Sequence, residues 1–385
     1  MSVTAARGFR AAGAVAGLKS SGDRDLALVH NLGPVHTAAA VFTSNRCKAN
    51  PVLWSEQAVA DGTVEAIVLN SGGANCYTGA VGFQVTHATA EAVAAALDAS
   101  AGDVLVCSTG LIGDQLDVDL LRAGVRGAAA GLSADDEGGL AAAQAIMTTD
   151  SHPKQASVIA DGWTVGGMAK GAGMLAPGLA TMLVVITTDA VCTSAELDAA
   201  LRAATRVTFD RLDSDGCMST NDTVALLCSG ASGVQPQSAA FTEALTAVCA
   251  DLALQLQADA EGAAHDIAIR VRGAATEDEA VAVGRAVSRS NLFKAAIFGN
   301  DPNWGRVLAA VGTTDAQFDP YGIDVSFNGV QVCRAGEPDE PRELVDLTPR
   351  AVSIVIDLHA GDTEATILTN DLTHDYVHEN SAYSS

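Results

Sequence analysis

One threonine stands between a glycine-rich loop and an apolar run, where its hydroxyl could act on its own backbone. Thr181 follows Ala180, and segment 170–179 before them holds three glycines and a proline, which relieve backbone crowding and fix a bend. Attack of the hydroxyl on the Ala180 carbonyl would turn the amide into an ester, and hydrolysis would leave Thr181 at the start of a new chain. Its freed amine, with an ordinary pKa of about 7.7–8, could then serve as the local base. The segment therefore predicts self-cleavage between Ala180 and Thr181 and a threonine nucleophile.

The same residues also fit a purely structural interpretation. Segment 182–186 is strand-like, so Thr181 could simply open a β-strand after an ordinary loop of glycine and proline. The pattern by itself favours this second interpretation and leaves the first one open.

A second hydroxyl lies at the end of another predicted strand. Thr109 and Gly110 follow the apolar segment 103–107. At a strand end, the threonine hydroxyl and the Gly110 N–H could converge on a developing oxyanion. As an isolated motif, a routine turn is the simpler explanation.

Further short blocks of polar and glycine residues run in one order along nearly the whole chain. They are 41–46, 70–75, 108–113, 147–150, 219–223, 299–306 and 379–385. Together with segment 170–183, these blocks resemble the ornithine acetyltransferase family, also called the bifunctional glutamate N-acetyltransferases of the cyclic arginine pathway. Because so many blocks occur in the same order, the resemblance is highly specific.

The resemblance implies roles that the pattern alone could not assign. It implies Thr181 as the nucleophile released by the cut after Ala180, and Thr109 and Gly110 as the oxyanion hole. A lysine suits a carboxylate and a glutamate suits a cationic amine, although such side chains and chain tails are ordinarily exposed to solvent. The substrate-binding positions that it implies are Thr148, Lys170, Thr181, Glu261, Asn380 and Ser385.

The implied activity is a two-step acetyl transfer. An acetyl-threonyl enzyme would carry the acetyl group from N2-acetylornithine to glutamate, with acetyl-CoA as a further co-substrate and with no bound cofactor or metal. Two cleaved precursors would form an α2β2 assembly, with α chain 1–180 and the β chain from 181. A self-processing N-terminal-nucleophile amidase or aminopeptidase is the alternative, because water could release the same acyl-enzyme. A third interpretation is a noncatalytic binding protein, which would require the chain to stay intact.

Composition sets independent limits on class and partners. The chain has 385 residues, of which 48% are hydrophobic and 18% charged, so we expect a globular protein with a substantial core. Its formal charge of −24 repels nucleic-acid backbones and anionic lipids, so we expect neither as a partner, and an anionic substrate would need local cations. The eight cysteines form no CxxC motif or ligand cluster, and the N-terminus is no convincing signal peptide. These features predict a cytoplasmic location with reduced thiols.

Strand and helix patterns alternate in β-α-β order, which predicts the α/β class. The resemblance implies a layered mixed α+β architecture with β-sheets packed between helices, that of a self-cleaving N-terminal-threonine acyltransferase of the ornithine acetyltransferase type. We expect a main α/β domain over 1–262 that carries the cleavage site. A C-terminal α/β domain would cover 263–385, and its tail would return to the active site. Strands are predicted at 64–69, 103–107, 266–271, 352–358 and 364–368, a hairpin at 323–332 around Asn328-Gly329, and helices at 81–99, 194–204, 239–260 and 277–293.

Three local motifs receive no catalytic role. Segment 17–20 resembles a phosphate-binding loop, but Leu18 separates the glycine from the lysine. His374 and His378 have a spacing that a helical zinc site could use, yet no metal motif surrounds them, so we expect surface histidines. Segment 301–306 reads as a helix start, with Asp301 or Asn303 as the cap and a proline in the first turn.

Overall fold

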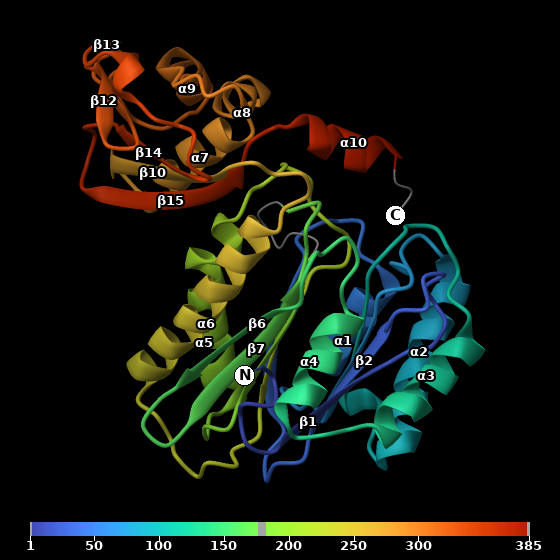
Figure 1. The fold of residues 1–385 in the computed structure, drawn as a ribbon. Helices are drawn as coiled ribbons and strands as arrows, with labels where there is room; N and C mark the ends of the chain where they lie inside the picture. The colour runs from blue at the N-terminus through green and yellow to red at the C-terminus, as the bar shows by residue number, and fades with distance from the viewer. Residues whose placement is uncertain (1, 176–181, 383–385) are drawn as a thin grey trace.

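The computed structural model describes residues 2–175 and 182–382, and two β-sheets packed face to face form the larger part of it (Figure 1). The four-stranded sheet has the order β1-β2-β4-β5, with β4 and β5 parallel. Its strands are β1 (Phe9–Ala14), β2 (Leu26–Asn31), β4 (Ala66–Asn70) and β5 (Val104–Ser108).

The second layer is a five-stranded sheet with the order β3-β9-β8-β7-β6. Strand β8 lies in its centre, antiparallel to β7 and parallel to β9, so that Lys170, Leu183 and Thr223 lie side by side in one row. The strands are β3 (Thr37–Phe42), β6 (Lys154–Ile159), β7 (Thr164–Lys170), β8 (Leu183–Thr188) and β9 (Thr223–Cys228).

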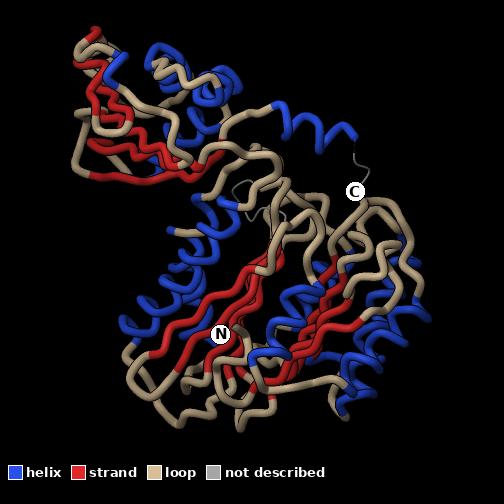
Figure 2. The backbone as a smooth tube through the Cα atoms, in the orientation of Figure 1, coloured by secondary structure: helices blue, strands red, loops and turns tan. Residues whose placement is uncertain are grey.

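Helices cover the outer faces of both sheets, as the paths in Figure 2 show. The four-stranded sheet packs against α2 (Gly79–Leu97) and α3 (Val118–Ala130), and the five-stranded sheet against α5 (Ser194–Val207) and α6 (Ser238–Ala258). Apolar side chains from both sheets and from α4 (Asp136–Ala145) fill the core between them. This confirms the predicted layered architecture with sheets packed between helices.

The ends of these elements follow from local sequence. Helix α5 begins at a capping box in which the Thr193 hydroxyl accepts from the Glu196 N–H and the Glu196 carboxylate accepts from the Thr193 N–H. Short elements complete this part of the chain, namely α1 (Asn50–Ala58) and the 3₁₀ turns η1 (Ala101–Asp103) and η2 (Phe209–Arg211).

A six-stranded sheet with the order β13-β12-β11-β14-β10-β15 forms the C-terminal part. The predicted Asn328-Gly329 turn joins β11 to β12, and both of its residues have positive φ, as a type I′ turn requires. The strands are β10 (Asp266–Ala274), β11 (Asp324–Phe327), β12 (Val330–Arg334), β13 (Glu337–Pro338), β14 (Ala351–Asp357) and β15 (Thr363–Asn370). The helices are α7 (Glu277–Ser288), α8 (Asn291–Phe298), α9 (Trp304–Val311) and the turn η3 (Arg342–Leu344).

Two helix predictions were wrong in detail. The helix expected over 277–293 is divided into α7 and α8, because the Ser290 hydroxyl accepts from the Phe293 N–H and caps a new helix. Helix α9 is capped by Asn303, one of the two predicted caps, so Pro302 precedes the cap instead of lying in the first turn.

Helix α10 (His374–Ala382) leads the chain back from the C-terminal sheet toward the two large sheets (Figure 1). The Thr373 hydroxyl donates to the Gly262 carbonyl at 2.6 Å, and a Cβ at Gly262 would lie 2.3 Å from the Tyr376 nitrogen. This close contact places α10 beside the turn that follows α6. The domain division at 262/263 stays a prediction.

Among the described helices, α6 is long and apolar enough to span a membrane by length and composition alone. Its apolar side chains instead contribute to the core on the outer face of the five-stranded sheet, where Leu245, Leu252 and Leu256 are fully buried. The cytoplasmic location stays a prediction.

Candidate active site

Thr109 and Gly110 lie directly beyond the end of β5, in a buried turn. The Thr109 N–H donates to the Asn70 carbonyl at 3.0 Å, and the Thr109 residue is only 2% exposed. Gly110 has φ +127°, and a Cβ there would lie 2.9 Å from the backbone of Gly73, so a glycine is required. The turn thus holds a hydroxyl and a backbone N–H near the same strand end.

Lys170, the last residue of β7, brings a cation to this turn. Its Nζ donates to Thr109 Oγ1 at 3.2 Å, and the residue is 1% exposed. Because the hydroxyl oxygen accepts from lysine, its own O–H stays available to donate elsewhere. Burial lowers the pKa of Lys170, and the nearby Asp150 carboxylate is the strongest influence against that shift.

Asp150 lies in the loop between α4 and β6 and accepts hydrogen bonds there. Its carboxylate accepts from the Thr148 N–H at 2.9 Å, the Gly171 N–H at 2.6 Å and the Lys154 Nζ at 2.6 Å. Burial favours a higher pKa for Asp150, but Lys170 and Lys154 outweigh it and hold the pKa below its usual range. The carboxylate is therefore ionised and balances the buried lysines.

Glu261 and Asn380 come together from distant parts of the chain. The Glu261 N–H donates to the Ala172 carbonyl at 3.0 Å, and the Asn380 side-chain amide of α10 donates to Glu261 Oε2 at 3.0 Å. A Cβ at Gly173 would lie 2.5 Å from the same carboxylate oxygen. The absence of a side chain there leaves room for the Glu261 carboxylate beside the glycine loop.

These residues share one cavity of about 130 Å³. It lies at the end of β5 and β7, next to the turn after α6 and the tail helix α10. Every described residue of the predicted site lines it, so chain segments more than 100 residues apart converge there. The lining residues are Thr109, Gly110, Thr148, Thr149, Lys170, Gly173, Met174, Glu261 and Asn380.

Three predicted residues lie outside the described part of the chain. They are Ala180 and Thr181, the expected cleavage site and nucleophile, and Ser385, an expected substrate contact. The catalytic and binding roles of all predicted site residues therefore stay predictions.

Asp222 lies next to the first described residue after this gap. Its Oδ1 accepts from the Met182 N–H at 3.1 Å, its Oδ2 has no hydrogen-bond partner among the described residues, and the side chain is fully buried. Burial raises the pKa of Asp222 well above its usual range, and the Met182 N–H, the Ser219 hydroxyl and Lys170 offset this only in part. Burial at this position therefore favours the protonated form of the Asp222 carboxyl.

Sequence reasoning assigned no role to three polar residues that build this region. Asp150 and Asp222 are described above, and the Asn221 side-chain amide donates to the Ala74 carbonyl at 2.6 Å and the Ser108 carbonyl at 2.8 Å. Asn221 thereby ties the β9 entry loop to the end of β5. All three lie in the short segments that carry the family resemblance, namely 147–150 and 219–223. Their position in those segments was the one feature of the sequence that could have indicated a role.

The described residues of the site offer no group of metal ligands. Across residues 2–175 and 182–382, no cluster of three or more His, Cys, Asp or Glu side chains could hold a metal ion. His374 and His378 lie on α10 and are exposed, as expected.

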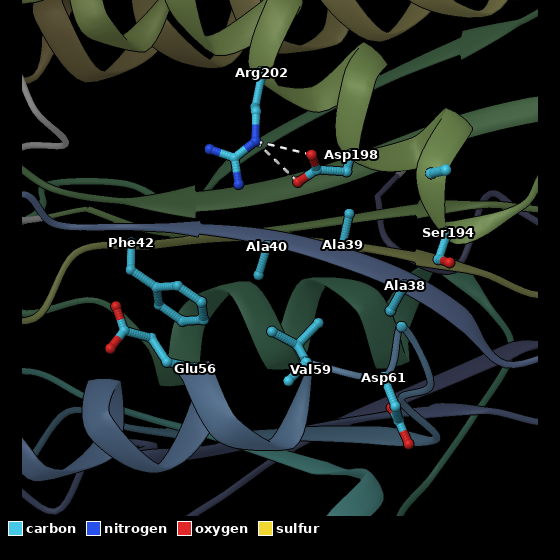
Figure 3. A pocket seen from close by; sticks show the side chains of 13 residues that line it. Ala38, Ala39, Ala40, Phe42, Glu56, Val59, Asp61, Ser194, Asp198 and Arg202 are labelled. Atoms are coloured by element: carbon cyan, nitrogen blue, oxygen red, sulfur yellow. Dashed lines mark hydrogen bonds and ion pairs between the residues drawn. The ribbon is translucent and has the colours of Figure 1, made fainter.

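A separate cavity of about 570 Å³ lies beside the edge strand β3, between α1 and α5 (Figure 3). Arg202 points toward Asp198 from the same helix, and its Nε donates to both carboxylate oxygens at 3.0 and 2.9 Å. The cation is therefore already paired, and no predicted site residue lines this cavity.

The geometry of the 130 Å³ cavity suits acyl chemistry. A hydroxyl and a glycine N–H can stabilise a developing oxyanion, while Lys170 and Glu261 supply opposite charges for a zwitterionic substrate. These groups surround one small space, which matches a small amino acid derivative better than a polymer.

Comparisons with known proteins agree with this description. The model of the ArgJ family matches residues 10–385. Proteins named arginine biosynthesis bifunctional protein ArgJ are 66% identical in Streptomyces coelicolor and 64% identical in Streptomyces avermitilis, and each alignment covers 100% of both chains. A solved structure of ornithine acetyltransferase complexed with ornithine, from Mycobacterium tuberculosis, is 56% identical over 47% of this chain and 96% of that chain, with a TM-score of 0.46.

Proposed function

This chain belongs to the ArgJ family, and from that premise we propose that it transfers the acetyl group of N2-acetylornithine to glutamate. It is an acyltransferase of arginine biosynthesis. The residues proposed to carry the transfer are Thr181 as the nucleophile and Thr109 and Gly110 as the oxyanion hole.

In the first half-reaction, the Thr181 hydroxyl oxygen attacks the acetyl carbonyl and its proton passes to the Thr181 α-amine. The negative oxygen of the tetrahedral intermediate accepts hydrogen bonds from the Thr109 hydroxyl and the Gly110 N–H. The C–N bond then breaks, the departing ornithine nitrogen takes the proton, and an acetyl ester remains on Thr181. In the second half-reaction, the glutamate α-amine attacks this ester and the threonine oxygen leaves with a proton.

The observation that carries this proposal is the shared cavity. Thr109, Gly110, Lys170 and Glu261 line the same space, so the oxyanion donors and the charges for substrate lie together. Lys170 is proposed to bind the substrate carboxylate and Glu261 its cationic amine. Thr148, Asn380 and Ser385 are proposed to bind the remaining polar groups of the substrate.

The nucleophile must first be released by self-cleavage between Ala180 and Thr181. Intact-mass spectrometry tests this step directly. The purified wild type should yield one fragment ending at Ala180 and one beginning at Thr181, while Thr181→Ala stays whole. With N2-acetylornithine alone, the fragment from Thr181 should gain one acetyl group. A different cut site, or acetyl transfer by Thr181→Ala at the wild-type rate, would refute the assignment.

Three further features belong to the same proposal. Acetyl-CoA acts as a second acetyl donor, two cleaved precursors form an α2β2 assembly in the cytoplasm, and the reaction uses no bound cofactor or metal. Formation of N-acetylglutamate from acetyl-CoA and glutamate, without N2-acetylornithine, tests the donor. Light scattering of the cleaved enzyme tests the assembly.

A self-processing amidase or aminopeptidase remains the second candidate. The same acyl-enzyme would serve both reactions, and they differ in whether water or an amine accepts the acyl group. Quantifying N-acetylglutamate and free acetate from one reaction with excess glutamate distinguishes them. Predominant acetate would favour the hydrolase.

A further inference from the structure

The two amino acids of the proposed reaction have side chains of opposite charge. The amine that leaves, ornithine, ends in an ammonium group, whereas the amine that enters, glutamate, ends in a carboxylate. Both must place their α-nitrogen at the same acetyl carbon, and the whole chain carries a formal charge of −24. A single electrostatic environment would favour one side chain and repel the other.

Two larger cavities adjoin the central one, and they differ in charge. One has a volume of about 510 Å³ and shares Thr148, Glu261 and Asn380 with the central cavity. Its further lining includes Glu379, an exposed residue of α10. This side contains two carboxylates and suits the ornithine ammonium.

The other cavity, of about 470 Å³, shares Gly110 and Thr148 with the central one and holds a lysine. Lys19 lies in its wall with Ser20, Ser21 and the exposed Asp23, so this side has one ammonium and one carboxylate where the other side has two carboxylates. Among the described residues that line these three cavities, Lys19 and Lys170 are the only lysines or arginines. Because Lys170 is proposed to bind the α-carboxylate, Lys19 remains for a second carboxylate.

Hydrogen bonds and close packing hold the loop that carries Lys19 in place. The buried Asp25 carboxylate accepts from the backbone N–H groups of Ala16, Leu18 and Lys19 at 2.6, 2.6 and 3.0 Å, which fixes the loop. A Cβ at Gly72 would lie 2.3 Å from the Leu18 Cβ, so the loop packs closely on the cavity wall.

Among the described residues, the Lys19 ammonium has acceptors for two of its three N–H groups, which leaves one donor for a ligand. Its Nζ donates to the Met147 carbonyl at 2.6 Å and to the Arg24 carbonyl at 3.3 Å, while an ammonium has three N–H groups. Met147 directly precedes Thr148, so this cation lies next to the wall of the central cavity. Burial lowers the pKa of Lys19, but nearby carboxylates, Asp25 first, oppose that shift and support the charged form.

We propose that Lys19 is the specificity-determining residue for the acceptor, binding the side-chain carboxylate of glutamate, whereas the Glu261 and Glu379 side receives the side-chain ammonium of ornithine. The inference rests on the proposed function and adds to it a division of the site by charge. Ornithine then directs its side chain to the two carboxylates, and glutamate directs its side chain to the Lys19 ammonium.

The two half-reactions allow a sharp test. Cleaved wild type, Lys19→Gln and Lys19→Arg are compared, first for ornithine release from N2-acetylornithine alone and then for acetyl transfer to glutamate or to glutamine, its neutral analogue. Arg270→Gln on β10 serves as the control, because it removes one exposed positive charge in the C-terminal sheet. Lys19→Gln should raise the KM for glutamate about tenfold, as expected for one charge-assisted hydrogen bond, with KM for glutamine unchanged.

The remaining measurements distinguish the loss of the Lys19 charge from a general structural defect of the variant. Ornithine release should be unchanged in Lys19→Gln, Lys19→Arg should retain the preference for glutamate over glutamine, and Arg270→Gln should match the wild type. Equal losses with glutamate and glutamine, or an unchanged KM for glutamate, would overturn the inference while the proposed function stands. If the wild type itself releases no ornithine from the donor, the proposed function fails and the inference fails with it.

Discussion

Replacing Thr109 by valine would remove one proposed oxyanion donor with little change in side-chain volume. The residue is 2% exposed, so bulk water has little access to replace the hydroxyl. Loss of one such donor typically lowers kcat by about 10²–10³, or roughly 2.7–4 kcal/mol of transition-state stabilisation. The Gly110 N–H remains, so activity should fall into this range without disappearing. Rapid-quench measurement of ornithine release from N2-acetylornithine reports the affected step.

Two controls separate this effect from misfolding. Thr109→Ser keeps the hydroxyl and should retain most of the activity. Thr89→Val removes another buried threonine hydroxyl, one that donates to the Val85 carbonyl within α2, and should leave kcat unchanged. If Thr109→Val releases ornithine within threefold of the wild-type rate, the oxyanion assignment is refuted.

Three other variants test the surrounding structure. Asp222→Asn should gain stability relative to the wild type as the pH rises above about 3.9, because the raised pKa of Asp222 makes the folded wild type bind more protons than its unfolded state. The difference in unfolding free energy should grow by at most about 1.4 kcal/mol per pH unit. Urea unfolding at pH 5 and pH 8 measures it, and an equal difference at both pH values would contradict the prediction. Asn221→Ala removes two buried hydrogen bonds to backbone carbonyls and should lower the free energy of unfolding by about 2–3 kcal/mol at neutral pH, whereas an unchanged urea midpoint would refute this. Gly173→Ala would place a Cβ 2.5 Å from the Glu261 carboxylate, so it should raise the KM for N2-acetylornithine about tenfold in steady-state assays; an unchanged KM would exclude a role of this carboxylate in donor binding.

Periodicity and turn residues predicted the helices and strands whose local sequence preference matches the structure they adopt. The β4-α2-β5 unit follows from two apolar runs around an amphipathic helix, and the hairpin follows from Asn328-Gly329. Strand β7 was not predicted, because Gly166 and Gly167 have low strand propensity. Tertiary contact explains Gly166, since a Cβ there would lie 2.1 Å from the Ser2 carbonyl.

The candidate site could be predicted only as separate pieces. Family resemblance gave Thr109, Lys170 and Glu261, but no spacing in the sequence indicates that Lys170 donates to Thr109 across 61 positions. The direction of the pKa shift of each aspartate could not be predicted either, because Asp150 and Asp222 have the same side chain and opposite pKa shifts. Only their surroundings differ: Asp150 contacts a lysine ammonium, whereas one Asp222 oxygen has no partner within residues 2–175 and 182–382.

The antiparallel pairing of β7 with β8 has a consequence for refolding. The proposed cut falls between these neighbouring strands, so each product would contribute strands to one continuous sheet. Before the cut, denatured protein can rebuild that sheet as one molecule at a rate independent of concentration. Afterwards two polypeptides must meet, so recovery from denaturant should become second order and slow on dilution. Cleavage would therefore replace unimolecular refolding by bimolecular association of two chains.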